Sequence, residues 1–192
     1  MKVAFSGTHI VGKTTLLMQY KEHLAATKGR DFVNLGYITG VARSIISRGF
    51  PLGKDGNIYS YINYINDQLK EEEGMGNYDV FISDRTLLSV FAYSSVNVSI
   101  PRPYIPDYFI EMVERIWLLE KEHYDLYIYF PIEFPALKQD RFHQLDEEYR
   151  AKVDAKIHET LEKHNVNHYH MTGSREIRLR KLINILHGQT RN

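Results

Sequence analysis

The sequence predicts an α/β domain in which a five-stranded parallel sheet is flanked by helices. Short apolar segments alternate with longer amphipathic ones along the chain, the pattern expected when each strand is followed by a helical crossover. The 192 residues suffice for one well-formed core but are few for two domains. Hydrophobic residues make up 43% and charged residues 25%, as in ordinary globular proteins. We therefore treat residues 1–192 as a single domain.

Each element follows from its local pattern. The segment 57–73, for example, has apolar or aromatic residues at 58, 61, 62, 65 and 69, a helical spacing. Segment 99–106 is a loop, because three prolines in six residues disrupt either regular element. The expected strands are 2–6, 32–38, 78–84, 125–130 and 166–172. The expected helices run from Lys13 to about Ala26 and over 43–48, 57–73, 86–94, 107–123, 146–164 and 174–186.

Composition excludes several classes of protein. Lys+Arg and Asp+Glu both number 24, which argues against binding nucleic acid through a strongly basic surface. Cysteine is absent, which rules out disulfides, a thiolate nucleophile and a thiolate zinc site. The N-terminal segment reaches glycine too early for a signal-peptide core, and no apolar run approaches the roughly 20 residues that span a bilayer. We expect a soluble cytoplasmic protein without a membrane partner.

The segment GTHIVGKTT (7–15) fits the phosphate-binding pattern G-x-x-x-x-G-K-[ST] through Gly7, Gly12, Lys13 and Thr14. Glycines let the backbone bend so that several N–H groups point at one phosphate chain. The lysine supplies a charge near the β and γ oxygens, and the threonine hydroxyl is placed to coordinate Mg²⁺. Because a predicted strand precedes the pattern and a predicted helix follows it, we expect a nucleoside triphosphate site.

Such loops serve switches, motors and kinases, so the loop alone does not decide the activity. The sequence has neither the D-x-x-G nor the N-K-x-D pattern that GTP switches usually carry. Ring-forming ATPases usually end a strand in Asp-Glu and add a small helical domain. Here the strand ends in Asp84 followed by Arg85, and the chain is too short for that domain.

Three segments together resemble the P-loop nucleoside and nucleotide kinases: GTHIVGKTT, FISDRTLLSVFAY (81–93) and QDRFHQLDEEYR (139–150). The chain is most similar to the nicotinamide-riboside-kinase-like ATPases and to the thymidylate and deoxynucleotide kinases, including phage-type members. The similarity extends over almost the whole chain in the right order. It implies the P-loop NTPase fold with a lid segment, and ATP and Mg²⁺ as cofactors.

The pair Asp84-Arg85 carries the second part of this resemblance. A carboxylate at the end of a strand beside the phosphate loop can hold Mg²⁺ or orient an attacking hydroxyl. The adjacent arginine can clamp the sugar or phosphate of the acceptor. A surface ion pair is the alternative. Many relatives have a second acidic residue where this chain has Ser89, whereas Tyr93 matches the family and is a candidate for substrate binding.

A lid is expected at about 134–150, between the fourth strand and the long helix. Kinases of this shape close such a segment over the phosphates to exclude water. Arg141 is the first candidate for the arginine that stabilises the transferring phosphoryl group, with Lys138 and Arg150 as alternatives. The other interpretation is a solvated charged loop.

The acceptor-binding region is expected at about 39–75, where Arg43 resembles the arginine that contacts the acceptor in relatives. Tyr59, Tyr61 and Tyr64 follow on the next helix; Tyr61 is our candidate among them for stacking on a base. Aromatic residues at helical spacing also pack in cores, and this alternative stays open.

The resemblance implies further contacts to ATP. In the loop these involve His9, Val11 and Thr15, and near the C-terminus the turn at Gly173 corresponds to one that lies beside the adenine in relatives. Ser174 also fits an N-cap of the last helix.

Two histidines, His168 and His170, fall on one face of the fifth predicted strand. Imidazole pairs of this kind suggest zinc, but the sequence offers no third ligand beside them. We therefore predict no metal site there.

The sequence thus predicts a kinase that transfers the γ-phosphoryl group of ATP to a nucleoside or a nucleoside monophosphate. Alternatives are a kinase that acts on a hydroxymethylated base in DNA, a P-loop ATPase that drives a partner, and a binding module that senses nucleotide without turnover. The partner is expected to be a small molecule rather than nucleic acid. A homodimer is possible through segment 107–123 with Trp117, although this residue fits a core equally well.

Overall fold

A computed structural model describes residues 1–27, 34–98, 105–135 and 146–188. Five parallel strands form one sheet in the order β2-β3-β1-β4-β5, which confirms the predicted fold class. The strands are β1 (Lys2–Ser6), β2 (Leu35–Ile38), β3 (Val80–Ser83), β4 (Leu126–Tyr129) and β5 (His168–His170). In the described part of the chain, the helices are α1 (Lys13–Ala26), α2 (Val41–Ser47), α3 (Ile58–Glu72), α4 (Leu87–Asn97), α5 (Asp107–Glu120), α6 (Glu147–Lys163) and α7 (Arg175–Gly188).

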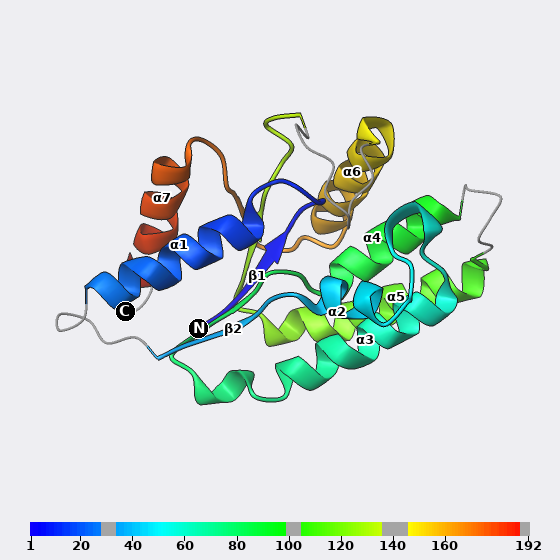
Figure 1. Ribbon diagram of the computed structural model, residues 1–192, viewed down its shortest axis with the longest axis horizontal. Helices are drawn as coiled ribbons and strands as arrows, with labels where there is room; N and C mark the ends of the chain where they lie inside the picture. Colours follow the sequence, from blue (N-terminus) through cyan, green and yellow to red (C-terminus); the bar gives the residue numbers. More distant parts are fainter. Residues whose placement is uncertain (28–33, 99–104, 136–145, 189–192) are drawn as a thin grey trace.

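Helices cover both faces of the sheet (Figure 1). Side chains alternate along β1, so that Val3 and Phe5 enter one core while Ala4 enters the other. The first core is completed by α1 and α7, which lie side by side in Figure 1. The second is completed by α3, α4, α5 and α6. Strands buried on both faces explain why the apolar segments of the sequence are nearly continuous.

The elements agree with the predictions apart from their ends. The predicted helix 86–94 continues to Asn97, and the helix predicted to reach His123 ends at Glu120 before a 3₁₀ turn. β1 has the predicted bounds, whereas β3, β4 and β5 are shorter than predicted, because periodicity marks the apolar segment rather than the residues that pair. None of the described helices is long and apolar enough to cross a membrane.

Trp117 is fully buried in the second core, where its ring stacks on Phe91 at a centroid distance of 6.3 Å. Its core role is therefore confirmed, and Trp117 offers no surface for a partner.

The order of the strands gathers the predicted site at one edge. β1 lies between β3 and β4, and β2 lies next to β3. Because all strands are parallel, the segments that follow β1, β2 and β3 meet at the carboxyl edge of the sheet. These segments contain the phosphate loop, Arg43 and the pair Asp84-Arg85.

Candidate active site

The phosphate loop requires glycine at both ends. Gly7 has φ 145°, and a Cβ there would lie 2.6 Å from the carbonyl oxygen of Phe130. Gly12 has φ 91° and precedes α1 without any side-chain cap on the first turn of the helix. No acidic residue occupies that first turn. The positive end of α1 is therefore left for an anion.

Lys13 is buried and folds back on its own loop, where Nζ donates to the carbonyl oxygens of Gly7 at 2.8 Å and Thr8 at 2.6 Å. Burial lowers the pKa of Lys13 well below its usual value, and the charge of Arg85 lowers it further, while Asp84 acts in the opposite direction. A polyphosphate beside Lys13 would offset both unfavourable effects.

Arg150 supports the loop from behind and is only 1% exposed. Its Nε donates to the carbonyl oxygen of His9 at 3.1 Å, and its Nη2 donates to that of Ile10 at 3.1 Å. Ile10 has φ 56°, which is costly for a β-branched residue and persists only where the surroundings enforce it. The two hydrogen bonds from Arg150 supply that enforcement.

Arg178 performs the same task one residue further along. Its Nη1 donates to the carbonyl oxygen of Val11 at 2.6 Å, and its Nε donates to that of Gly173 at 3.0 Å. It also forms an ion pair with Glu133, whose carboxylate accepts from the N–H of Gly173 at 3.0 Å. Arg178 therefore joins the phosphate loop to the turn that was predicted to lie near adenine. Because these loop carbonyls are bonded to cationic groups, the backbone groups that the loop offers to a ligand are N–H groups, apart from that of His9, which donates to Tyr93.

Thr14 and Asp84 face each other across the edge of the sheet. The Thr14 hydroxyl donates to Oδ2 of Asp84, while Oδ1 of Asp84 is buried and has no hydrogen-bond partner among the described residues. An unpaired buried carboxylate oxygen beside a hydroxyl fits a hard cation, because Mg²⁺ takes oxygen ligands. The two predicted metal-binding residues are therefore brought together.

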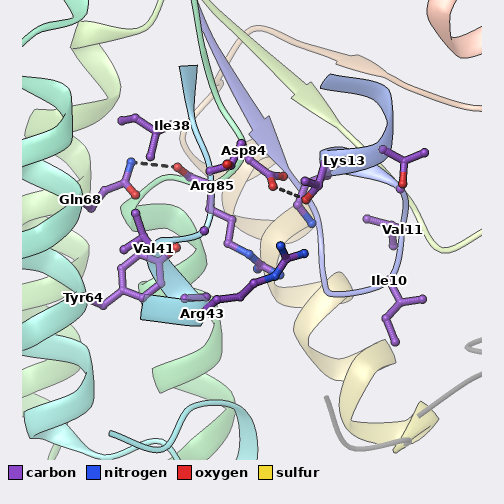
Figure 2. Close-up of a pocket in the computed structure, with 16 residues that line it drawn as sticks. Ile10, Val11, Lys13, Ile38, Val41, Arg43, Tyr64, Gln68, Asp84 and Arg85 are labelled. Atoms are coloured by element: carbon purple, nitrogen blue, oxygen red, sulfur yellow. Dashed lines mark hydrogen bonds between the residues drawn. The ribbon is translucent and has the colours of Figure 1, made fainter. Parts of the chain in front are cut away.

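A pocket of about 260 Å³ opens in front of the loop (Figure 2). It joins the phosphate loop to the segment after β2, to the end of β3 and to α3. Its cationic side chains are Lys13, Arg43 and Arg85, against the single carboxylate of Asp84. The lining residues are Ile10, Val11, Gly12, Lys13, Thr14, Thr15, Ile38, Thr39, Gly40, Val41, Ala42, Arg43, Tyr64, Gln68, Asp84 and Arg85. This excess of positive charge suits an anionic ligand.

A family model described as an AAA domain matches residues 2–178, almost the whole chain. The chain belongs to this AAA-domain family. No curated protein sequence matches this member of the family. Its resemblance to P-loop nucleoside and nucleotide kinases is confirmed by the family match and by the fold of its structural neighbours.

Solved structures share the fold of this AAA-domain protein at low sequence identity. Deoxyadenosine kinase from M. mycoides, solved with dCMP and dCDP, has a TM-score of 0.68 at 15% identity, covering 98% of this chain and 100% of that chain. NadR in complex with NR has a TM-score of 0.72 at 16% identity over 97% of this chain but only 51% of NadR. Thymidylate kinase from Ehrlichia chaffeensis has a TM-score of 0.65 at 16% identity, with coverage of 97% and 98%. This AAA-domain chain therefore has the fold of a P-loop kinase.

Tyr93 lies behind the pocket wall of this AAA-domain protein, next to Arg85, which lines the pocket. The Tyr93 hydroxyl accepts from the backbone N–H of His9 at 3.2 Å and lies 2.9 Å from His9 Nδ1. Arg85 lies over the Tyr93 ring, 5.9 Å from its centroid. Burial opposes the charge of Arg85, but Tyr93, Tyr64 and Asp84 outweigh it and raise the pKa of Arg85. Arg85 is therefore held charged, and Tyr93 links it to the phosphate loop.

Gln68, a residue that the sequence did not single out, fixes the turn after β3. Its Nε2 donates to the carbonyl oxygen of Arg85 at 3.0 Å and to the Ser83 hydroxyl oxygen at 3.0 Å. It also donates to Glu72 at 2.6 Å. The helical spacing of 68 and 72 places both on one face of α3, but no sequence pattern connects them to Arg85.

The predicted tyrosines separate in the structure. Tyr64 lines the pocket, whereas Tyr61 packs near Phe109 in the core, with ring centroids 6.3 Å apart, and accepts a hydrogen bond from Asn97 at 3.0 Å. Tyr59 is 74% exposed. The structure thus places Tyr64, and not Tyr61, at the pocket.

Three cases remain among the candidates. Val11 and Thr15 line the pocket, while Gly173 does not line it and is joined to the loop through Arg178. Arg141 and Lys138 lie outside the described residues.

Proposed function

We propose that the protein is an ATP- and Mg²⁺-dependent kinase that phosphorylates a nucleoside or a nucleoside monophosphate. The observation that carries this proposal is one pocket in which the phosphate loop and Asp84 face two further cations, Arg43 and Arg85. A protein that only hydrolyses ATP has no need of a second set of cations beyond the γ-phosphate. A kinase needs them to hold an acceptor in line.

The phosphate loop would bind the triphosphate through its N–H groups and the positive end of α1. Lys13 would exchange the carbonyl oxygens of Gly7 and Thr8 for phosphate oxygens. Thr14 and Asp84 would hold Mg²⁺, which neutralises charge on the phosphates when bound. The loop and α1 thus define where the γ-phosphorus lies.

The acceptor would lie against the opposite wall, between Arg43, Arg85 and Tyr64. Two arginines at that wall favour an acceptor that itself carries phosphate, because guanidinium groups bind phosphate oxygens in pairs. In the transfer, an acceptor oxygen forms a bond to the γ-phosphorus while the bond to the β–γ bridging oxygen breaks, and ADP leaves. An ionised monophosphate needs no base; from a hydroxyl acceptor, Asp84 would take the proton.

Structures of similar fold support both acceptor classes. One is a deoxyadenosine kinase with dCMP and dCDP bound, one is NadR with NR, and one is a thymidylate kinase. The two arginines favour the monophosphate in this chain, and thymidine, cytidine and adenine nucleotides are the first compounds to test.

An acceptor screen tests the proposal. Untagged protein with γ-labelled ATP and Mg²⁺ is incubated with nucleosides, nucleoside monophosphates, nicotinamide riboside and DNA containing hydroxymethylated bases. Label that appears on a nucleoside or monophosphate, and disappears in Lys13→Ala, supports the kinase. Label on the DNA would favour the polymer substrate instead. Release of phosphate with no labelled acceptor would replace the kinase by a partner-driven ATPase.

A further inference from the structure

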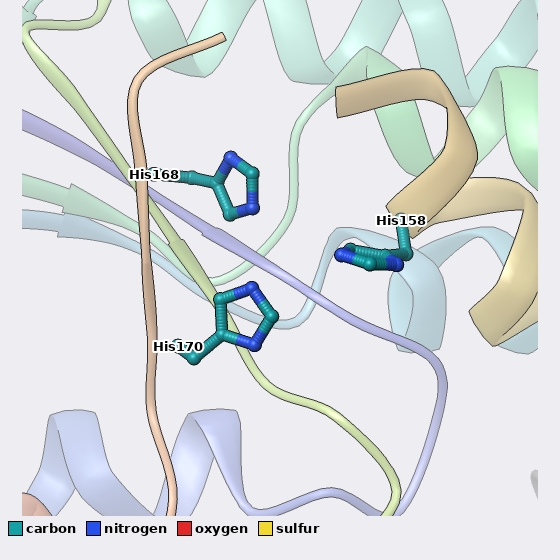
Figure 3. A group of neighbouring side chains, drawn as sticks. All are labelled: His158, His168 and His170. Atoms are coloured by element: carbon teal, nitrogen blue, oxygen red, sulfur yellow. The ribbon is translucent and has the colours of Figure 1, made fainter. Parts of the chain in front are cut away.

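Three histidines come together on the side of the sheet where β5 meets α6 (Figure 3). His168 and His170 belong to β5, and His158 belongs to α6. One ligand nitrogen from each ring lies within 4.8 Å of the other two. The prediction that no third ligand accompanies His168 and His170 is therefore wrong, because the third comes from a helix and not from the strand.

The backbone presents these rings to one point. Residues two apart on a strand face the same side, and the rings of His168 and His170 stack at a centroid distance of 5.2 Å. Tyr129 on the neighbouring strand stacks on His158 at 5.1 Å and meets His170 edge-on at 5.2 Å. Its hydroxyl is fixed in turn by Asp154, at 3.0 Å. The imidazoles are thus held together by packing before any ligand binds.

Hydrogen bonding determines which nitrogen His168 presents. Its Nδ1 lies 2.8 Å from the carbonyl oxygen of Val166, and because a carbonyl only accepts, Nδ1 carries the proton. In the neutral ring, Nε2 then presents its lone pair. A metal-binding histidine is typically oriented by such a hydrogen bond to its other nitrogen.

Glu162 lies beside two of the three rings. Its Oε1 lies 3.4 Å from Nε2 of His168 and 3.7 Å from Nε2 of His158. A carboxylate oxygen and an imidazole lone pair are both acceptors, so a positive centre is needed between them. This centre is either a proton on the imidazole or a cation.

We propose that His158, His168 and His170 bind a zinc ion, with Glu162 as the fourth ligand. Three imidazoles and one carboxylate form a tetrahedral donor set that zinc accepts. Nitrogens bonded to zinc at 2.0–2.1 Å lie about 3.4 Å apart, so small side-chain rotations from the present positions close the site.

The ion would connect α6 to the edge strand β5. Arg150, which holds the phosphate loop, lies on the same face of α6 as Asp154 and His158, at successive steps of four residues. Zinc would therefore fix the helix that supports the loop without contacting the nucleotide site. This role is structural and does not depend on the proposed kinase activity.

Metal binding by the nucleotide-free, untagged protein tests the site. Co²⁺ is titrated while the visible absorption of tetrahedral cobalt is followed, and Zn²⁺ is then added in competition. We expect one equivalent of Co²⁺, displaced by Zn²⁺, and a higher melting temperature with Zn²⁺ present. His158→Gln is the principal variant, because the side chain is 43% exposed and its loss leaves the core intact. It should weaken binding at least 10-fold, since even removal of an outer-sphere partner has an effect of this size.

His123→Gln is the matched control, because this histidine is exposed, lies in the 3₁₀ turn after α5 and does not belong to the cluster. Glu162→Gln should weaken binding and alter the cobalt spectrum, which distinguishes a ligand from a nearby charge. Absence of the tetrahedral band, or equal binding by His158→Gln and His123→Gln, would overturn the proposal. Neither result depends on phosphoryl transfer.

Discussion

The two walls of the pocket differ in how their cations are bonded. On the phosphate side, Arg150 and Arg178 are buried and each donates to backbone carbonyls of the loop. On the opposite side, Arg43 is exposed, and neither Arg43 nor Arg85 forms an ion pair within the described part of the chain. The arginines behind the phosphate wall are therefore bonded within the protein, whereas those of the proposed acceptor wall have no carboxylate paired with them among the described residues.

This difference reflects two kinds of recognition. A triphosphate is bound mainly by backbone N–H groups, so the fold must hold the backbone in a costly conformation, as it does at Ile10. An acceptor is selected by side chains, which can be changed without disturbing the loop. Substitutions on the two walls should therefore affect different quantities.

The largest effect is expected from Lys13→Ala on the phosphate wall. Loss of one preorganised charge at the transferring group should lower kcat by about 10²–10³-fold. The melting temperature without nucleotide should change little, because the buried charge of Lys13, whose pKa burial lowers, is unfavourable, whereas its hydrogen bonds to Gly7 and Thr8 are favourable. Initial rates and thermal melts measure the two effects. Transfer at the wild-type rate would refute the assignment of the loop.

Arg150→Met should destabilise the backbone of the phosphate loop. The carbonyl oxygens of His9 and Ile10 would lose their buried donors, at a cost of about 2–4 kcal/mol in the free energy of unfolding. Denaturant unfolding measures this loss, and ATP binding should weaken in parallel. Lys152→Met, two residues away and paired with Glu148 at the surface, should change stability by less than about 1 kcal/mol. Equal losses in both variants would contradict the supporting role of Arg150.

Arg43→Met tests the opposite wall, where the acceptor is proposed to bind. Loss of a charged hydrogen bond to the acceptor should raise the KM for the acceptor about 10-fold. The affinity for ATP and the unfolding free energy should stay near their wild-type values, because Arg43 is exposed. Arg48→Met is the matched control, since Arg48 pairs with Asp67 away from the pocket. A loss of ATP affinity in Arg43→Met would show that the walls are not separate.

The smallest effect concerns the buried carboxyl groups that support the acceptor wall. Glu120 accepts from the backbone N–H of Leu87 at 3.1 Å, and burial together with the charge of Glu72 raises its pKa well above the usual value. The native state therefore keeps this proton to higher pH than the unfolded chain does. The contribution of protonated Glu120 to the free energy of unfolding is fully present below the pKa that this group has in the unfolded chain, about 4.5. It is lost as the pH rises through the pKa of Glu120 in the folded protein.

Glu120→Gln should remove this dependence, so that the free energy of unfolding falls less steeply as the pH rises above about 4.5. Urea unfolding across that range measures it. Glu111→Gln, an exposed position on the same helix, should leave the slope unchanged. A Glu120→Gln profile as steep as that of the wild type would exclude Glu120 as its cause.

The sequence by itself determined the strands, the helices and the short motifs, because each of these depends on residues that are close together in the chain. Alternating apolar segments predicted the strands and helices, because side-chain periodicity is a property of each element alone. The glycines of the phosphate loop and the pair Asp84-Arg85 could be recognised for the same reason. These residues lie directly at strand ends, and parallel strands bring their ends to one edge of the sheet.

Only the tertiary structure decided which distant side chains complete the sites. Arg178 bonds to Val11 from 167 positions away, and His158 joins His168 and His170 from a different element. Tyr61 and Tyr64 could not be told apart on one helix, because their roles depend on what packs against each face. Contacts of this kind depend on the relative placement of whole elements, which the packing of the two cores establishes and no local pattern encodes.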